Sequence, residues 1–191
     1  MARKKTTSQR PIDFEPFKKT HPYLKDIPAF LDSLNEESDR GAVLIAAAML
    51  DDALALAIQR HLVDHKDTKK LTEGFNAPLG TFSARILGAF ALGIISEAEY
   101  AEIEIIRKIR NKFAHSVIAS FRDQQISDWC ADLRGGVPGL DSNPRGRYST
   151  SIVPLIILTL NRANSGAGAR FVFQRPDNER LRLKRNGPRN S

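Results

Sequence analysis

Residues 38–63 read SDRGAVLIAAAMLDDALALAIQRHLV, and this stretch decides the fold. It is rich in Ala and Leu, which favour helix, and it contains no Gly or Pro after Gly41. At about 100° per residue, apolar side chains surround nearly the whole helical cylinder. A helix that is apolar on nearly every side is typical of the centre of a bundle. The sequence therefore predicts one long central helix over residues 38–63.

Shorter helix signals lie on both sides of this segment. Ser96-Glu-Ala-Glu99 has the pattern of a capping box, and Gly93 suits the position just after a helix. The other expected helices are 28–37, 81–92, 96–115, 124–134 and 147–161. Pro154 is expected to kink the last of these or to mark its true start. Residues 64–78 are expected to form a loop or short helix and a turn, and residues 170–174 a short strand. The predicted fold class is all-α, a compact helical bundle around the central helix.

The positive charge of the chain is concentrated at its two ends. The 191 residues carry a formal charge of +7. Residues 1–25 hold seven Lys and Arg against two acids, and residues 162–191 hold eight against two. The remaining 14 basic and 18 acidic residues give residues 26–161 a charge of −4. We therefore expect a helical domain over 26–161 between a basic N-terminal tail, 1–25, and a basic C-terminal tail, 162–191.

Composition also narrows the class of protein. A single cysteine, Cys130, excludes a disulfide framework and a cysteine-based zinc site. It also favours the reducing cytoplasm as the location. No run reaches the roughly 18 apolar residues of a membrane span, and residues 1–10 lack the apolar core of a secretion signal. His61 and His65 have a metal-ligand spacing but no third ligand nearby, so we expect neither a metal nor a cofactor.

A few charged residues are predicted to face inward. On a helical wheel, Asp51 lies in an apolar sector of the central helix, with Arg40 on the same stripe. Arg110 lies inside the apolar arc of the 96–115 helix. Because a buried carboxylate needs a partner, we expect Asp51 to pair with Arg110, with Arg85 completing the network. The predicted buried polar network or pocket comprises Arg40, Asp51, Arg85, Arg110 and Asn111. It is either an ion-pair cluster that fixes helix register or an anion-binding or catalytic pocket.

Several segments, in this order, carry a resemblance to a known family. They are Glu37-Ser-Asp-Arg-Gly41, Leu50-Asp51, Asn76-Ala-Pro-Leu-Gly-Thr-Phe-Ser-Ala-Arg-Ile86, Ala91-Leu-Gly-Ile-Ile-Ser96 and Glu104-Ile-Ile-Arg-Lys-Ile-Arg-Asn-Lys-Phe-Ala-His115. Over roughly residues 30–160 the chain resembles the mannitol operon repressor family of bacterial proteins. It departs from the family where Ala77 replaces the glycine of an Asn-Gly-Pro turn.

This resemblance implies an all-helical, homodimeric protein assigned to transcriptional repression. The sequence contains no convincing helix-turn-helix, since neither candidate turn is followed by an exposed basic helix. Repression would then act through a protein partner or through the tails. Mannitol as an effector does not follow from the residues.

A looser similarity gives an alternative function. Arg110-Asn-Lys-Phe-Ala-His115 is similar to the Arg-x4-His motif of HEPN-type domains, which are helical and often cleave RNA or bind nucleotides. The implied enzyme is a metal-independent endoribonuclease, with His115 as general acid/base, Arg110 stabilising phosphate charge and Asn111 orienting the phosphate or the imidazole. Residues 110 and 115 lie about 140° apart on an ideal helix. A shared site would therefore require fraying or a second subunit.

The basic tails have two interpretations. Their charged residues could contact a nucleic-acid backbone without sequence preference, or they could serve solubility alone. The candidate contact residues are Lys4, Lys5, Arg180, Arg182, Lys184 and Arg185.

Overall fold

The chain folds into an all-helical bundle. The computed structural model describes residues 24–63, 65–135 and 143–165. Within these residues there are six α-helices and no strand. The helices are α2 (Ile27–Glu36), α3 (Asp39–His61), α4 (Phe82–Ala91), α5 (Glu97–His115), α6 (Gln124–Asp132) and α7 (Pro144–Ser165), with a 3-10 helix, η2, at Thr68–Leu71. The predicted all-α class is confirmed. Residues 170–174 lie outside the described residues, as do residues 1–23 of the N-terminal tail and 166–191 of the C-terminal tail. The expected start of the C-terminal tail at residue 162 is wrong, because residues 162–165 continue α7.

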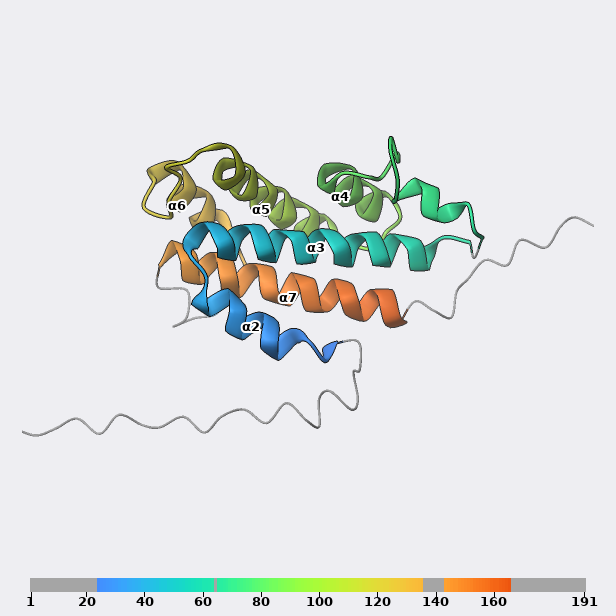
Figure 1. Ribbon diagram of the computed structural model, residues 1–191, viewed down its shortest axis with the longest axis horizontal. Coiled ribbons are helices and arrows are strands. Elements are labelled where there is room, and N and C mark those ends of the chain that lie inside the picture. The colour runs from blue at the N-terminus through green and yellow to red at the C-terminus, as the bar shows by residue number, and fades with distance from the viewer. Residues whose placement is uncertain (1–23, 64, 136–142, 166–191) are drawn as a thin grey trace, which may run out of the picture.

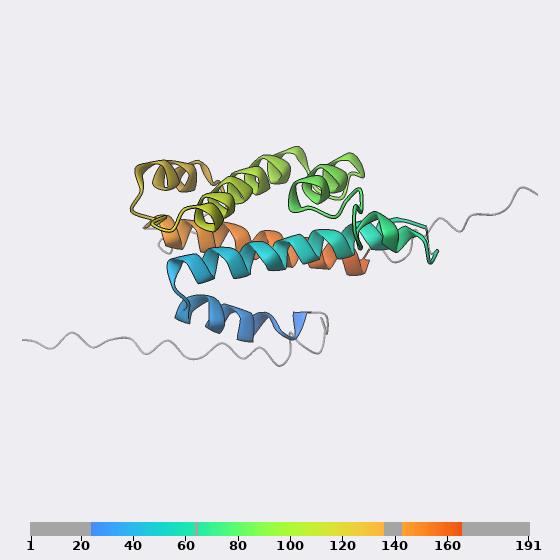
Figure 2. The ribbon, with the colours of Figure 1, turned by 45° about the horizontal axis from the view of Figure 1, so that its top comes forward.

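Helix α3 lies at the centre of this arrangement. Figures 1 and 2 show α7 beside α3 and pointing the same way, α2 packed below them, and α4, α5 and α6 above. Buried side chains lie along the length of α3, among them Val43, Leu50, Leu54 and Ile58. By length and composition α3 is also apolar enough to cross a membrane, and 50% of its apolar window is buried inside the protein. The expectation of a central helix is therefore met.

Helix α7 is fixed to α3 by polar contacts at their shared N-terminal ends. The fully buried Tyr148 donates its hydroxyl hydrogen to the Val43 carbonyl at 3.1 Å. Arg145 pairs with Asp39 at 2.8 Å. The helix begins at Pro144 and continues through Pro154, so the second of the two alternatives for Pro154, that it marks the true start of the helix, is wrong. Burial of the surrounding α7 residues against α3 offsets the loss of one backbone hydrogen bond at the proline.

Helix α5 runs antiparallel to α7 and begins at the predicted capping box. The Ser96 hydroxyl oxygen accepts from the Glu99 amide, and the Glu99 carboxylate accepts from the Ser96 amide at 2.8 Å. Glu99 also pairs with Arg162 of α7 at 2.8 Å. Although burial alone would raise it, the Ser96 amide, Arg162 and the Ser96 hydroxyl together lower the pKa of Glu99. One carboxylate thus caps α5 and joins it to α7.

We expect Glu99→Gln to lower the free energy of unfolding by about 1 kcal/mol at pH 7, because it removes the charge from a cap and an interhelical pair. A carboxyl whose folded pKa is lowered stabilises the fold above its unfolded pKa, and this contribution is lost as pH falls through the folded value. The difference in the free energy of unfolding between wild type and variant should therefore shrink towards pH 3. Urea denaturation at both pH values measures it, and a difference that does not depend on pH would contradict the role of the charge.

The core at one end of the bundle is aromatic. The ring centroids of Phe113 and Phe121 lie 5.1 Å apart, and those of Phe121 and Tyr148 lie 5.8 Å apart. This row of rings connects α5 to α7 through the segment that precedes α6.

Cys130 of α6 is also buried. Burial raises the pKa of its thiol to about 12, so the thiol stays protonated at neutral pH.

Candidate functional site

The start of α4 faces the middle of α5 and α3 across a surface pocket. The pocket has a volume of about 370 Å³. Its lining residues come from all three helices and from the turn before α4: Asp51, Gly80, Thr81, Phe82, Ser83, Arg107, Arg110 and Asn111. Three of the five residues of the predicted polar network, Asp51, Arg110 and Asn111, therefore share this one pocket.

Arg85 of α4 is the ion-pair partner of Asp51. Arg85 Nη1 lies 2.9 Å from Asp51 Oδ1, and the two side chains are 13% and 25% exposed. Arg85 also donates through Nε to the Leu79 carbonyl and through Nη2 to the Thr72 carbonyl, each at 3.0 Å. These two bonds fix the guanidinium plane, and no well-aligned hydrogen bond reaches the buried Oδ1. The contact is therefore electrostatic and not a bidentate fork.

The expected Asp51–Arg110 ion pair does not form. Arg110 Nη1 instead donates to Oδ1 of the neighbouring Asn111 at 3.1 Å. The positive charge of Arg110 still acts on Asp51, but burial is the dominant effect and raises the pKa of that carboxyl. The prediction failed because the wheel places Arg110 towards α3 without showing that α4 brings a second, anchored arginine to the same carboxylate.

Arg40 belongs to a different part of the protein. Its guanidinium donates to the carbonyls of Phe113, Ser116 and Val117, with a distance of 2.8 Å to the last. It therefore satisfies carbonyls at the C-terminal end of α5, where a cation is also favoured by the helix dipole. Its assignment to the Asp51 network was wrong, because side chains on one stripe of a helix as long as α3 can face different neighbours.

His115 is not in the pocket that contains Arg110. It is the last residue of α5, and its side chain is exposed. Phe113 precedes it in the buried core. Helix α5 shows no fraying between Arg110 and His115, so within one chain the two motif residues do not share a site.

The pocket includes residues that the sequence did not single out. Arg107 lines it and forms a two-point contact with Glu104, at 3.0 and 2.8 Å. Thr81 is the N-cap of α4, and its hydroxyl accepts from the Ala84 amide. The spacing of Arg107 and Arg110 by three residues places both on one face of α5 and was the available signal.

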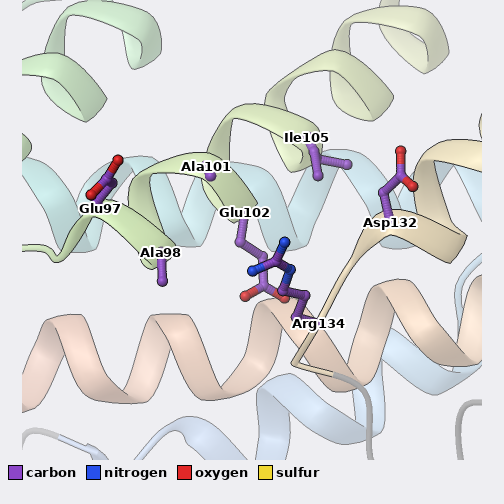
Figure 3. Close-up of a pocket in the computed structure, with 7 residues that line it drawn as sticks. All are labelled: Glu97, Ala98, Ala101, Glu102, Ile105, Asp132 and Arg134. Atoms are coloured by element: carbon purple, nitrogen blue, oxygen red, sulfur yellow. The ribbon is translucent and has the colours of Figure 1, made fainter.

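A second and larger pocket lies along α5 towards the end of α6. It has a volume of about 550 Å³. Figure 3 shows its lining residues, Glu97, Ala98, Ala101, Glu102, Ile105, Asp132 and Arg134. One carboxylate oxygen of Glu102 already accepts a hydrogen bond from the Gly135 amide, at 2.8 Å. Among the described residues, no group of three or more His, Cys, Asp or Glu side chains is arranged to hold a metal ion.

Fold and site together define a helical protein with an arginine-containing surface pocket between α3, α4 and α5. No protein-family model, no curated protein and no solved structure matches the chain. The tail residues Lys4, Lys5, Arg180, Arg182, Lys184 and Arg185 lie outside the described residues.

Proposed function

We propose that this chain is a bacterial transcriptional regulator of the mannitol operon repressor type, which acts by binding and not by catalysis. One observation carries the second half of this proposal. The pocket brings Arg110 together with hydrogen-bonding groups, while His115, the acid/base that RNA cleavage would need, lies outside it. A pocket that lacks this histidine favours recognition of a ligand over the RNA cleavage of the alternative function.

Direct DNA reading by a helix-turn-helix is disfavoured within the described residues. The most similar arrangement is α4, the turn that follows it, and α5. In a helix-turn-helix the N-terminal residues of the second helix approach the bases. Here that position carries Glu97 and Glu99, whose negative charges would repel phosphates. This supports a repressor that acts through a protein partner or through the basic tails.

Deleting the gene in its host should change the transcripts of a small set of operons, and expression of the wild-type protein from a plasmid should reverse the change. RNA sequencing of the three strains measures this. Transcripts that are unchanged on deletion would contradict the proposed role. The inferred cytoplasmic location would be checked by fractionation of the same cells.

The alternative function is a HEPN-like endoribonuclease that uses Arg110 and His115, completed by a second subunit. Incubation of the purified protein with total RNA, beside a His115→Ala control, separates the two functions. We expect no cleavage by either protein. Cleavage by the wild type that His115→Ala abolishes would establish the nuclease instead.

Two further expectations concern partners. We propose a homodimer, which light scattering after size exclusion would test, and a monomer at all concentrations would contradict it.

We also propose non-specific nucleic-acid contact through the tails. Gel shifts in a salt series should weaken when Lys4, Lys5, Arg180, Arg182, Lys184 and Arg185 are replaced by Gln. An unchanged affinity would exclude the tails as the contact.

A further inference from the structure

We infer that the pocket between α4 and α5 binds the phosphate group of a small phosphorylated molecule, with Arg110 as its principal ligand. This inference goes beyond the regulatory function and does not depend on it. It rests on the charges of the pocket, on the donors that remain free there, and on the size and surroundings of the pocket.

Charge compensation leaves Arg110 as the available cation of the pocket. Asp51 is held by Arg85, and Arg107 is held by Glu104. Arg110 has no carboxylate in ion-pair contact among the described residues, and its one hydrogen bond goes to the neutral amide of Asn111. A partly buried guanidinium without an anionic partner is suited to bind one, because its fork matches two oxygens of a phosphate.

The first turn of α4 adds donors on the opposite wall. The Thr81 hydroxyl oxygen accepts a hydrogen bond from the Ala84 amide. The amides of Phe82 and Ser83 therefore have no acceptor within the described part of the chain. The Ser83 hydroxyl lies beside that of Thr81, at 3.3 Å. Free amides at the start of a helix favour an anion, and the residues that carry them, Phe82 and Ser83, line the same pocket as Arg110.

The size and surroundings of the pocket favour a small ligand over a nucleic-acid backbone. Its volume of about 370 Å³ lies within the roughly 300–1,000 Å³ of small-molecule clefts. Asp51 lines the pocket, and its charge is compensated by Arg85, as that of Glu104 is by Arg107. Asp52 follows outside the pocket, on the exposed side of α3. A polyanion passing over this surface would also meet Asp52, whereas a single phosphate inside the pocket meets Arg110 and a carboxylate whose charge is already compensated.

Amide NMR of the full-length, ¹⁵N-labelled protein tests the inference, with inorganic phosphate as the first probe. We expect saturable shifts of the backbone amides of Phe82 and Ser83 and of the Asn111 side-chain amide. Ribose 5-phosphate should produce the same shifts at lower concentration, and an RNA oligonucleotide without terminal phosphates should not. Absence of saturable shifts at these groups up to tens of millimolar phosphate would overturn the inference, as would stronger shifts with the oligonucleotide.

Variants of arginine separate a specific site from general attraction to a basic protein. Arg110→Gln should weaken phosphate binding about tenfold or more, since a charge-assisted pair is lost. Arg110→Lys, which keeps the charge and guards against a folding defect, should weaken it less. Arg122→Gln, at an exposed arginine outside the pocket, should leave affinity unchanged. Equal affinities for wild type and Arg110→Gln would refute the assignment, whatever the transcript profile of the deletion strain shows.

Discussion

Replacing Phe113 with alanine should lower the free energy of unfolding by about 3–5 kcal/mol, the usual cost of truncating a buried phenylalanine. Phe113 is completely buried on α5, and its ring lies tilted at 54° to that of Phe121, with the centroids 5.1 Å apart. Phe121 in turn contacts Tyr148 of α7. The variant loses the transfer energy of the ring and leaves a cavity between two helices and a loop. Neighbouring rings cannot fill it without moving the α5–α7 contact.

Chemical denaturation followed by circular dichroism measures this change, and for a chain of this size the melting temperature should fall by roughly 10 °C. Phe75→Ala is the matched control, because the Phe75 side chain is 97% exposed. It should change the stability by less than about 0.5 kcal/mol. Similar losses in the two variants would show that the aromatic row is not part of the core.

Arg85→Gln should lower the free energy of unfolding by about 2–4 kcal/mol at pH 7. The substitution removes the partner of Asp51 together with the hydrogen bonds to Leu79 and Thr72. Breaking a fully buried pair costs about 3–5 kcal/mol, and the 25% exposure of Asp51 reduces that cost. The principal penalty is the carboxylate that remains in the pocket without its cation.

The stability cost of Arg85→Gln should depend on pH, because the pKa of Asp51 is raised in the folded protein. Burial already raises the pKa of Asp51, and loss of Arg85 removes an effect that lowers it. A raised folded pKa destabilises the fold at neutral pH, and this penalty disappears as pH falls towards the unfolded value of 3.8. The cost of Arg85→Gln should therefore be smaller at pH 4 than at pH 7.

A double variant isolates the carboxylate. Adding Asp51→Asn to Arg85→Gln should recover part of the stability at pH 7, because it removes the carboxylate that Arg85→Gln leaves without its partner. Arg122→Gln again provides the exposed-arginine control. If the double variant is no more stable than Arg85→Gln alone, the ion pair does not explain the loss.

The sequence was sufficient for most helices because their signals are local. The predicted 96–115 and 81–92 helices match α5 and α4 to within one residue, since Ser96 and Thr81 cap them. The final helix was placed too narrowly, at 147–161 instead of Pro144–Ser165, because its ends depend on tertiary contacts such as Arg145 with Asp39. The short helix η2 fell within a segment for which loop and short helix had both been expected.

The site was harder to predict because it depends on how three helices meet. A helical wheel identifies which residues point inward, and it marked Asp51, Arg85 and Arg110. It does not show which of the two arginines forms the ion pair with Asp51. That choice depends on the Leu79 and Thr72 carbonyls, which hold Arg85 in place and leave Arg110 free.

A crystal structure of the wild-type protein grown with a phosphomonoester would show whether Arg110 is available for a phosphate group. We expect phosphate density in the pocket, about 3 Å from the Arg110 guanidinium and beside the first-turn amides of α4. Arg110 folded onto Asp51, with no phosphate in the pocket, would refute the phosphate site.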